Sequence, residues 1–382
     1  MTGTSGDRLR IGVVGCGSIS EAYMRNAALF IGVEVVACAD LNPTTASKRA
    51  AEFGVTAMEV DDLLAAPGVD LVLNLTVPAA HFDVTMRALA ENKHVFTEKP
   101  LSDTAAGGRA ILAEANKRGL TVGSAPDTFM GAAGRTARRL IEEGAIGRPV
   151  IGTAFMMGRG MEHWHPDPSF YYQPGGGPVL DMGPYYLTMM VNLMGPVSRV
   201  HAVSTSGQTE RLITAQGPKQ GTTFPVETPT SVLSLLEFAC GAKVTFGASW
   251  DVFRHTPPPI ELHGTEGSLR LPDPDNFSGV IGLSRAGAPW EDTDTARFTF
   301  GGFNWPTVNP DRANYRMVGL ADMARALREG TRPRASAGLA LHVLEVLEAV
   351  LTAGGTGRAV DVAPVDCQPE ALTEEDAKAL LQ

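Results

Sequence analysis

The chain has 382 residues, of which 44% are hydrophobic and 19% are charged; this composition is typical of a globular protein and excludes a disordered one. At roughly 150 residues per domain, the length predicts two domains. The 32 Lys and Arg residues and 42 Asp and Glu residues give a net charge of −10. Without a basic block, this charge argues against general nucleic-acid binding.

Membrane insertion and export are not expected from the sequence. No run of about 18 apolar residues predicts a transmembrane helix. The apolar stretch after Arg10 is interrupted by Gly12, Gly15 and Gly17, so we do not interpret it as a signal peptide. The cysteines form no CxxC pair, which favours reduced buried thiols in a cytoplasmic protein. They are widely separated along the chain: Cys16, Cys38, Cys240 and Cys367.

The first third of the chain alternates short apolar runs with helical segments. Strands are predicted over 10–15, 33–39, 69–75, 93–97 and 120–124, and helices over 18–30, 43–53, 79–92 and 103–118. This alternation, with nearly continuous apolar strands, is typical of a parallel sheet covered by helices on both faces. We therefore predict a doubly wound α/β domain over residues 1–126.

Strands predominate after a turn at 144–149, which predicts a second domain over 127–355 with a largely antiparallel sheet. The segments 208–228 and 272–279 are expected to be loops. A tail, 356–382, follows, in which Thr373 and Asp376 predict a short capped helix. Strands are expected over 150–157, 198–205, 230–238, 242–249, 259–263, 267–271 and 296–300. Helices are expected over 134–143, 181–194, 314–329 and 336–353, the last with Leu339, Val343, Val346 and Val350 at core spacing.

A glycine-rich loop joins the first strand to the first helix. Gly15 permits a tight turn, Gly17 lets the backbone approach a pyrophosphate, and the helix that opens at Ser18 and Ile19 offers free N–H groups. Ser20 replaces the third glycine of the usual pattern and is small enough for close packing. The alternative is an ordinary glycine-rich turn of an α/β domain.

The cofactor preference is predicted from the end of the second strand. Asp40 lies 23 residues after Gly17, where a carboxylate can accept hydrogen bonds from the adenosine ribose and repel a 2′-phosphate. No basic residue occupies the next few positions, and Lys48 and Arg49 come a full helical turn or more later. We therefore predict NAD rather than NADP. The alternative is that Asp40 only caps a turn with Asn42.

Four segments together resemble the glucose–fructose oxidoreductase/inositol dehydrogenase/MocA family. They are GVVGCGSI at the start, KHVFTEKPL at 93–101, GAIGRP at 144–149 and GGGPVLDMGPYY at 175–186. The resemblance extends from residue 10 to about 350. It implies a Rossmann domain followed by an α/β domain with a large, mostly antiparallel open sheet. The open face of that sheet commonly forms an interface, which implies a homodimer or homotetramer.

The resemblance also implies which residues form the active site at the domain junction. The lysine of the EKP motif corresponds to Lys99, and the aspartate of the GGG motif to Asp181. Many members have a histidine four residues beyond that aspartate, but this chain has Tyr185, as in the glucose–fructose oxidoreductase and sugar ketoreductase branches. The residues implied at the nicotinamide and its ribose are Thr76, Pro78, His81, Glu98 and Lys99.

The residue types support oxidation of a secondary alcohol. A nearby ammonium favours the phenolate, so we expect Lys99 to lower the pKa of Tyr185 and Tyr185 to exchange the proton. The rival assignment makes Lys99 the acid/base, with its pKa depressed by burial. Lys99 could instead form a surface salt bridge with Glu98, and Asp181 could be a simple N-cap. Pro184 is tolerated in a first helical turn, which places the helix start near 180–181.

Substrate contacts are predicted in the loop that leads to this helix. Sugars bind through aromatic faces and hydrogen bonds, and the loop contains both kinds of side chain. A metal bound by the two histidines is an alternative, but no third ligand is indicated and we predict no metal. Packing of the loop is the other alternative. The candidates are His163, Trp164, His165 and Tyr172, together with Lys99, Asp181 and Asp127, which follows the last strand of the first domain.

These observations predict an NAD-dependent oxidoreductase acting on a secondary hydroxyl or ketone of a sugar, glycoside or cyclitol. Lys99 and Tyr185 would handle the proton and Asp181 would orient the reacting groups. Two other functions stay open at this point. One is a catalytically silent dinucleotide-binding sensor of metabolites, and the other is a redox-neutral glycosidase or lyase that uses NAD transiently.

Overall fold

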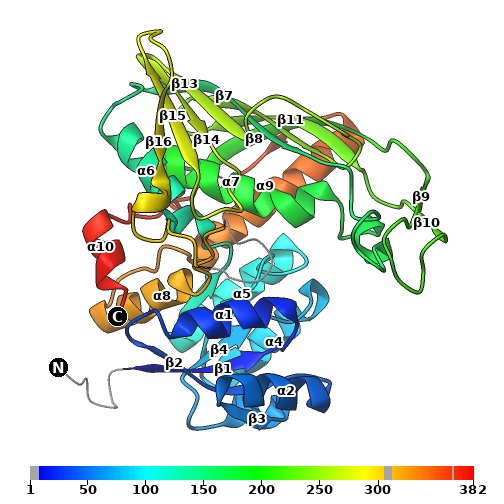
Figure 1. Cartoon of the computed structure of the whole chain (residues 1–382), viewed down its shortest axis with the longest axis vertical. Helices are drawn as coiled ribbons and strands as arrows, with labels where there is room; N and C mark the ends of the chain where they lie inside the picture. Colours follow the sequence, from blue (N-terminus) through cyan, green and yellow to red (C-terminus); the bar gives the residue numbers. More distant parts are fainter. Residues whose placement is uncertain (1–7, 305–311, 364) are drawn as a thin grey trace.

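The computed structural model describes residues 8–304, 312–363 and 365–382. Its N-terminal part is a parallel six-stranded sheet in the order β3-β2-β1-β4-β5-β6, with helices packed on it (Figure 1). This confirms the predicted doubly wound sheet. The strands are β1 Leu9–Val14, β2 Val33–Ala39, β3 Thr56–Met58, β4 Leu71–Asn74, β5 His94–Thr97 and β6 Val122–Ser124. The helices are α1 Ser18–Ala27, α2 Pro43–Phe53, α3 Val60–Ala65, α4 Pro78–Ala90 and α5 Ala105–Arg118.

The C-terminal part is a nine-stranded sheet in the order β16-β15-β14-β13-β7-β12-β11-β8-β17. All its pairs are antiparallel except β7 with β12, as expected for a mostly antiparallel sheet. The strands are β7 Pro149–Met157, β8 Val197–Thr205, β11 Ser231–Phe238, β12 Lys243–Ser249, β13 Ile260–Gly264, β14 Gly267–Leu271, β15 Val280–Arg285, β16 Glu291–Asp294 and β17 Val360–Asp361.

Helices lie between the two sheets. Figure 1 shows α6 (Ala132–Glu142), α7 (Pro178–Met194) and α9 (Ala337–Thr356) on the side of the large sheet that faces the N-terminal domain. Strands of the large sheet alternate buried and exposed residues, as β11 does, because one face packs on these helices and the other faces outward. The catalytic helix predicted from the sequence, α7, is therefore held in the middle of the molecule.

The chain crosses back to the first sheet near its end. Helix α8 (Val318–Glu329) packs against β2 and β6 of the N-terminal sheet. Residues 356–382 include β17 and the short helix α10 (Glu374–Ala379), and Leu381 forms a bridge with Phe30. The side chain of Thr373 accepts the N–H of Asp376, which confirms the predicted cap of α10. The C-terminal segment therefore packs on both parts of the molecule.

Several predictions for the second domain were wrong. Residues 296–300 do not form a strand: the side chain of Asp294 caps a 3₁₀ turn, η3 (Thr295–Arg297), which ends the edge strand β16. The strands β15 and β16 were not predicted. Three of the four residues of β16 are acidic, because it lies at the edge of the sheet, where burial does not select apolar side chains. The expected loop 208–228 contains a hairpin, β9 (Glu210–Leu212) and β10 (Thr223–Pro225).

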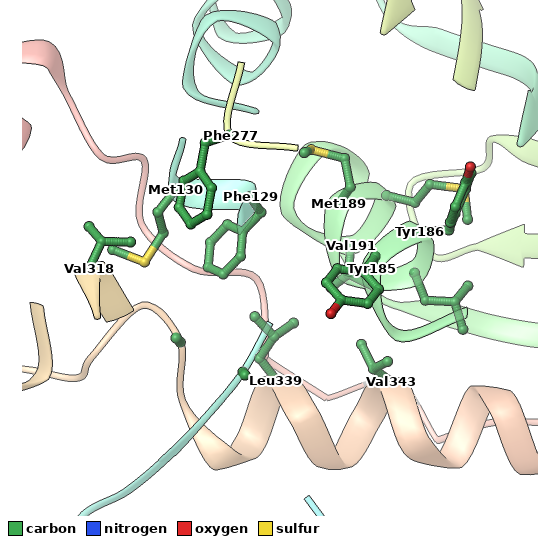
Figure 2. Close-up of a cluster of buried hydrophobic side chains, with 14 of the residues drawn as sticks. Phe129, Met130, Tyr185, Tyr186, Met189, Val191, Phe277, Val318, Leu339 and Val343 are labelled. Carbon is green, nitrogen blue, oxygen red and sulfur yellow. The ribbon is translucent and has the colours of Figure 1, made fainter. Parts of the chain in front are cut away.

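Helix α9 is long and apolar enough to cross a membrane, by length and composition alone. Its apolar side chains are nevertheless buried against α5, α7 and β8, which is typical of a core helix. The interpretation of its apolar spacing as core is confirmed, since Leu339, Val343, Val346 and Val350 are all buried. Figure 2 shows Val343 below the ring of Tyr185 and Leu339 below Phe129, whereas Tyr186 lies away from them.

Candidate active site

The glycine-rich loop has the geometry of a dinucleotide cradle. Gly15 has a φ of +99°, and a Cβ there would lie 2.5 Å from the carbonyl oxygen of Leu75, so only glycine fits. Gly17 faces open space and precedes α1, which has no side-chain N-cap. Ser20 is buried and its hydroxyl donates to the Gly17 carbonyl at 2.6 Å. The free N–H groups at this helix start fit a pyrophosphate, as predicted.

Asp40 lies beside this loop at the carboxyl end of β2. Its carboxylate accepts the N–H of Cys16 and the N–H of Asn42, each at 2.8 Å. It therefore caps the turn, but a carboxylate has further lone pairs for ribose hydroxyls, so the two roles are compatible. The next residue, Leu41, is 95% exposed and offers an apolar surface of the kind that an adenine ring covers. Sequence reasoning missed Leu41.

Helix α2 brings a cation to the same loop. Arg49 lies two turns into α2, yet its guanidinium is 3.4 Å from the carbonyl oxygen of Gly17. It also pairs with Glu52 at 2.7 Å. The sequence argument treated this arginine as remote from Asp40, whereas the helical repeat returns it to the edge of the cradle.

The turn after β4 holds three of the residues assigned to the cofactor. Thr76 is half-buried and Pro78 is exposed at the start of α4. His81 is fully buried, and its two ring nitrogens lie 3.0 Å from the carbonyl oxygen of Thr76 and 2.7 Å from that of Pro100. His81 therefore fastens this turn to the EKP segment and does not face the cradle, which corrects its assignment as a direct cofactor contact.

The EKP segment connects the two domains. The carboxylate of Glu98 accepts the hydroxyl of Tyr23 at 2.9 Å and the N–H of Lys99 at 2.8 Å. The Lys99 ammonium points the other way and donates to Asp181, at 2.6 Å to its carbonyl and 3.1 Å to its carboxylate. It also lies 5.4 Å from the centroid of the Tyr185 ring. Lys99, Asp181 and Tyr185 are thus brought together, and Lys99 makes no side-chain salt bridge with Glu98.

Helix α7 begins earlier than predicted. Its N-cap is Gly177 and its first residue is Pro178, so Asp181 is not an N-cap and Pro184 lies inside the helix. A proline there cannot donate to the carbonyl of the fourth residue before it, which loosens this turn. Asp181 and Tyr185 still share one face, because they are four residues apart. The distorted turn is where the Asp181 carbonyl meets the Lys99 ammonium.

The pKa values of the two candidate proton carriers differ from expectation. Burial lowers the pKa of Lys99, but the carboxylates of Asp181 and Glu98 and the hydrogen bond to Asp181 outweigh it, so this pKa lies above its ordinary value. Burial raises the pKa of Tyr185 to about 12; Asp275 also raises it, whereas Lys99 and Arg316 lower it. Lys99 therefore lowers the pKa of Tyr185, as expected, but desolvation of the phenol exceeds this effect and the net pKa is raised. The depressed pKa expected for Lys99 in the rival assignment is not found.

Two charged residues missed by sequence reasoning act on Tyr185. The guanidinium of Arg316 is buried and pairs with Asp275 at 2.9 Å. Asn26 of α1 holds the backbone of this segment through the Arg316 carbonyl at 3.0 Å. The next residue, Met317, has a φ of +106°, a strained conformation for a side chain of this kind. No motif or spacing could have indicated Arg316, because the segment approaches the site only in the folded chain.

Asp127 is not placed to contact a substrate. It is fully buried, and its carboxylate accepts the N–H groups of Met317 at 3.2 Å and Gly319 at 3.0 Å. Burial raises its pKa to about 6, although the two N–H donors and the charge of Arg316 lower it. Asp127 therefore fixes the start of α8, which corrects its assignment to the substrate.

The loop before α7 is divided between exposed and buried side chains. His163 and Trp164 are exposed, and His165 is half-buried with its Nδ1 accepting the N–H of Asp167 at 3.1 Å. Tyr172 is fully buried with its hydroxyl bonded to Glu162, so its assignment to the substrate is wrong. Burial, and then the charge of Asp181, raise the pKa of its neighbour Tyr171, while Lys99 lowers it, so Tyr171 is within electrostatic range of both. Within the described residues, no group of three or more His, Cys, Asp or Glu side chains could hold a metal ion.

Family sequence models match both parts of the chain. An oxidoreductase family model with an NAD-binding Rossmann fold matches residues 9–125, and the GFO/IDH/MocA C-terminal domain matches residues 135–270. The 1,5-anhydro-D-fructose reductase of Ensifer adhaerens is 26% identical over 359 residues, covering 92% of this chain and 98% of that protein. The dTDP-3,4-didehydro-2,6-dideoxy-alpha-D-glucose 3-reductase of Streptomyces violaceoruber is 32% identical over 268 residues, covering 69% and 72%.

Solved structures share the fold. An NAD-binding oxidoreductase from Klebsiella pneumoniae has a TM-score of 0.79 at 23% identity, covering 94% of this chain and 100% of that chain. A levoglucosan dehydrogenase in complex with NADH and levoglucosan also has a TM-score of 0.79, at 22% identity, and covers 94% and 100%. The two-domain architecture of this chain is therefore that of known oxidoreductases.

Proposed function

Because the chain belongs to the GFO/IDH/MocA family of oxidoreductases, we propose that it is an NAD-dependent enzyme acting on a sugar, glycoside or cyclitol. The reaction moves a hydride between nicotinamide and a secondary hydroxyl or ketone. One observation carries this proposal: the Lys99 ammonium, from the first domain, bridges to Asp181 and lies over Tyr185, both from the second.

The bound nicotinamide would supply or accept the hydride, and the chain would supply the rest of the chemistry. Tyr185 exchanges the proton with the substrate oxygen, and Lys99 donates a hydrogen bond to that oxygen. Asp181 holds Lys99 and orients a sugar hydroxyl. The raised pKa of Tyr185, about 12, keeps the phenol protonated at neutral pH, which suits proton donation to a ketone during reduction.

The residues of the cradle support NAD over NADP. Gly15, Gly17, Ser18 and Ile19 would hold the pyrophosphate through backbone groups, and Asp40 would accept the ribose hydroxyls. The negative charge of Asp40 opposes a 2′-phosphate. Thr76 and Pro78, at the start of α4, and Glu98 with Lys99 would border the nicotinamide end.

The test is a substrate scan in both directions. Purified protein is mixed with NAD⁺ and a panel of aldoses, methyl glycosides and inositols, or with NADH and the corresponding ketones, and NADH absorbance is followed. We expect turnover of at least one carbohydrate. NAD binding without turnover of any member would support the sensor instead. Release of an aglycone without net NADH would support the redox-neutral glycosidase or lyase.

The outer face of the large sheet supports self-association into a homodimer or homotetramer. Ile151 on β7, Val203 on β8 and Leu233 on β11 are exposed, and Val203 and Leu233 are register partners. Exposed apolar side chains side by side are typical of a protein interface. We expect Val203→Asp to reduce the molecular mass measured by sedimentation, with Ile31→Asp, on the first domain, as control. An unchanged mass with Val203→Asp would contradict this interface.

The same proposal places the chain in the cytoplasm. All four cysteines are free thiols, as expected for a reducing compartment. Fractionation of cells that produce the protein checks this, and recovery from the membrane or the medium would contradict it.

A further inference from the structure

Two large aromatic side chains are exposed in the loop before α7. Trp164 is 55% exposed and Phe170 is 54% exposed, although rings of this size bury a large apolar area when they can. They belong to a group of four adjoining rings, Trp164, His165, Phe170 and Tyr171, which we call the aromatic platform. Its position in the sequence, just before the helix that carries Asp181 and Tyr185, makes its surroundings important for the substrate.

The rings of the aromatic platform pack on one another. The His165 ring makes edge contacts with Trp164, Phe170 and Tyr171, at centroid distances of 5.4, 5.4 and 5.6 Å. Phe170 lies over Tyr171 at 4.1 Å, and Tyr171 contacts Trp250, which follows β12, at 6.1 Å. The four rings therefore form one surface, with its inner end against the sheet and its outer end in solvent.

A charge network centred on the buried Arg211 holds the platform in place. Glu162 pairs with Arg211 of β9 at 2.8 Å, and Arg211 also pairs with Asp251. The N–H groups of Thr214 and Ala215, in the hairpin loop, donate to the Glu162 carbonyl at 2.9 Å. Figure 1 shows this β9–β10 hairpin beside the loop at one end of the large sheet. Breaking a buried ion pair is costly, so the exposed rings are kept in one arrangement.

The inner end of the platform adjoins the reacting side chains. The Tyr171 carbonyl accepts the N–H of Gly177 at 2.7 Å, and the Gly177 carbonyl accepts the N–H of Asp181 at 3.0 Å. Burial is the largest cause of the raised pKa of Tyr171, but Asp181 adds to it and Lys99 opposes it, so its hydroxyl lies in their electrostatic range. A molecule that reacts at Lys99 and Asp181 would therefore extend along Tyr171 toward Phe170 and Trp164.

We propose that the aromatic platform binds the second ring of a two-ring substrate, so that the preferred substrates are glycosides with a sugar or aromatic group beyond the reacting ring. This inference rests on the function proposed above. The C–H face of a pyranose and the face of an aromatic aglycone are both flat and apolar, and both pack on aromatic rings by dispersion. Rings that are already fixed lose little entropy on binding.

The test compares a monosaccharide with a disaccharide and an aryl glycoside of the same reacting sugar. For the wild type, we expect kcat/KM to be at least about tenfold higher for a two-ring substrate than for the monosaccharide. In Trp164→Ala and Phe170→Ala this ratio should fall toward one. A gain with the disaccharide alone identifies the second ring as a sugar, and a gain with the aryl glycoside alone identifies an aromatic aglycone.

Trp290→Ala is the matched control. Trp290 is also partly exposed, but it follows β15 near the far edge of the sheet and packs under Arg270 at 4.7 Å. We expect Trp290→Ala to keep the wild-type ratio of kcat/KM between two-ring and one-ring substrates.

A second measurement is the Kd of the aryl glycoside by calorimetry with NADH present, which needs no turnover. It should weaken by at least about tenfold in Trp164→Ala.

The outcomes separate this inference from the proposed function. Equal kcat/KM values for one-ring and two-ring substrates in the wild type would overturn the platform and leave the oxidoreductase standing. No turnover of any carbohydrate would overturn the function, and the calorimetric Kd would still decide the platform. If Trp164→Ala dissociates the oligomer without changing the ratio, the rings are an interface between copies and the inference is wrong.

Discussion

The Lys99 ammonium binds Asp181 at two points, its carbonyl at 2.6 Å and its carboxylate at 3.1 Å. Lys99 follows β5 of the first domain and Asp181 lies in the first turn of α7 of the other, so this contact joins the domains at the proposed reacting centre. The negative partners outweigh burial and keep the ammonium charged. We therefore propose that Lys99 donates a hydrogen bond to the substrate oxygen and that Tyr185 carries the proton.

Single-turnover rates can test whether Tyr185 exchanges the proton and Lys99 donates a hydrogen bond to the substrate oxygen. We expect Tyr185→Phe to lower the rate of hydride transfer by about 10²–10⁴, because the proton carrier is lost. Lys99→Met should lower it by about 10²–10³, because one donor to the substrate oxygen is lost. Lys117→Met, at an exposed lysine of α5, is the control. An unimpaired Tyr185→Phe enzyme would make Lys99 the proton carrier.

The role of Arg316, which sequence reasoning did not identify, can be tested by comparing variants of Arg316 and Arg312. Both pair with Asp275, at 2.9 and 3.0 Å, but Arg316 is the one that lowers the pKa of Tyr185. We expect Arg316→Met to slow alcohol oxidation about tenfold, because a cation that lowers the pKa of Tyr185 is lost, and to shift the alkaline limb of the pH–rate profile to higher pH. Arg316→Lys should restore part of the rate. Equal losses in Arg312→Met would mean that Arg316 acts only by holding Asp275.

Asp127 predicts a dependence of stability on pH. Its pKa is raised from 3.8 to about 6 in the folded chain, so the folded state binds the proton more tightly than the unfolded state. Its contribution to the free energy of unfolding is therefore complete below pH 4 and falls by up to about 3 kcal/mol as the pH rises through 6. In urea unfolding, the free energy of Asp127→Asn should not decline as the pH rises through 6. The control Asp83→Asn, at an exposed aspartate of α4, should show the wild-type decline. A wild-type decline in Asp127→Asn would contradict the raised pKa assigned to Asp127.

Cofactor selection depends on the charge of Asp40. Asp40→Asn removes the repulsion of a 2′-phosphate while keeping an acceptor for the Cys16 N–H. We expect the ratio of Kd values, NADPH to NADH, to fall about tenfold or more in a fluorescence titration. Adding Arg49→Gln should weaken NADPH again, because Arg49 lies at the Gly17 carbonyl. Unchanged NADPH binding in Asp40→Asn would show that Asp40 does not select the cofactor.

The N-terminal domain was predictable because its signals are local. Strands and helices differ in the spacing of their hydrophobic residues along the sequence. The glycine-rich loop can be recognised from the strand that precedes it and the helix that follows it. The strands of the second domain were harder to identify. The acidic strand β16 forms by pairing with β15, and β9 and β10 form a separate two-stranded sheet by pairing with each other. The composition of either segment alone resembles a loop.

The chemical groups and their order after the dinucleotide loop could be read from the residues alone: Asp40, then Lys99, then Asp181 with Tyr185 one helical turn on. Which of these groups meet depends on the folding of the whole chain. That folding buried Tyr172 and left Tyr171 beside the site, turned Asp127 toward the backbone of α8, and brought Arg316 next to Tyr185. Such choices depend on packing between distant segments, and no local period or spacing encodes that packing.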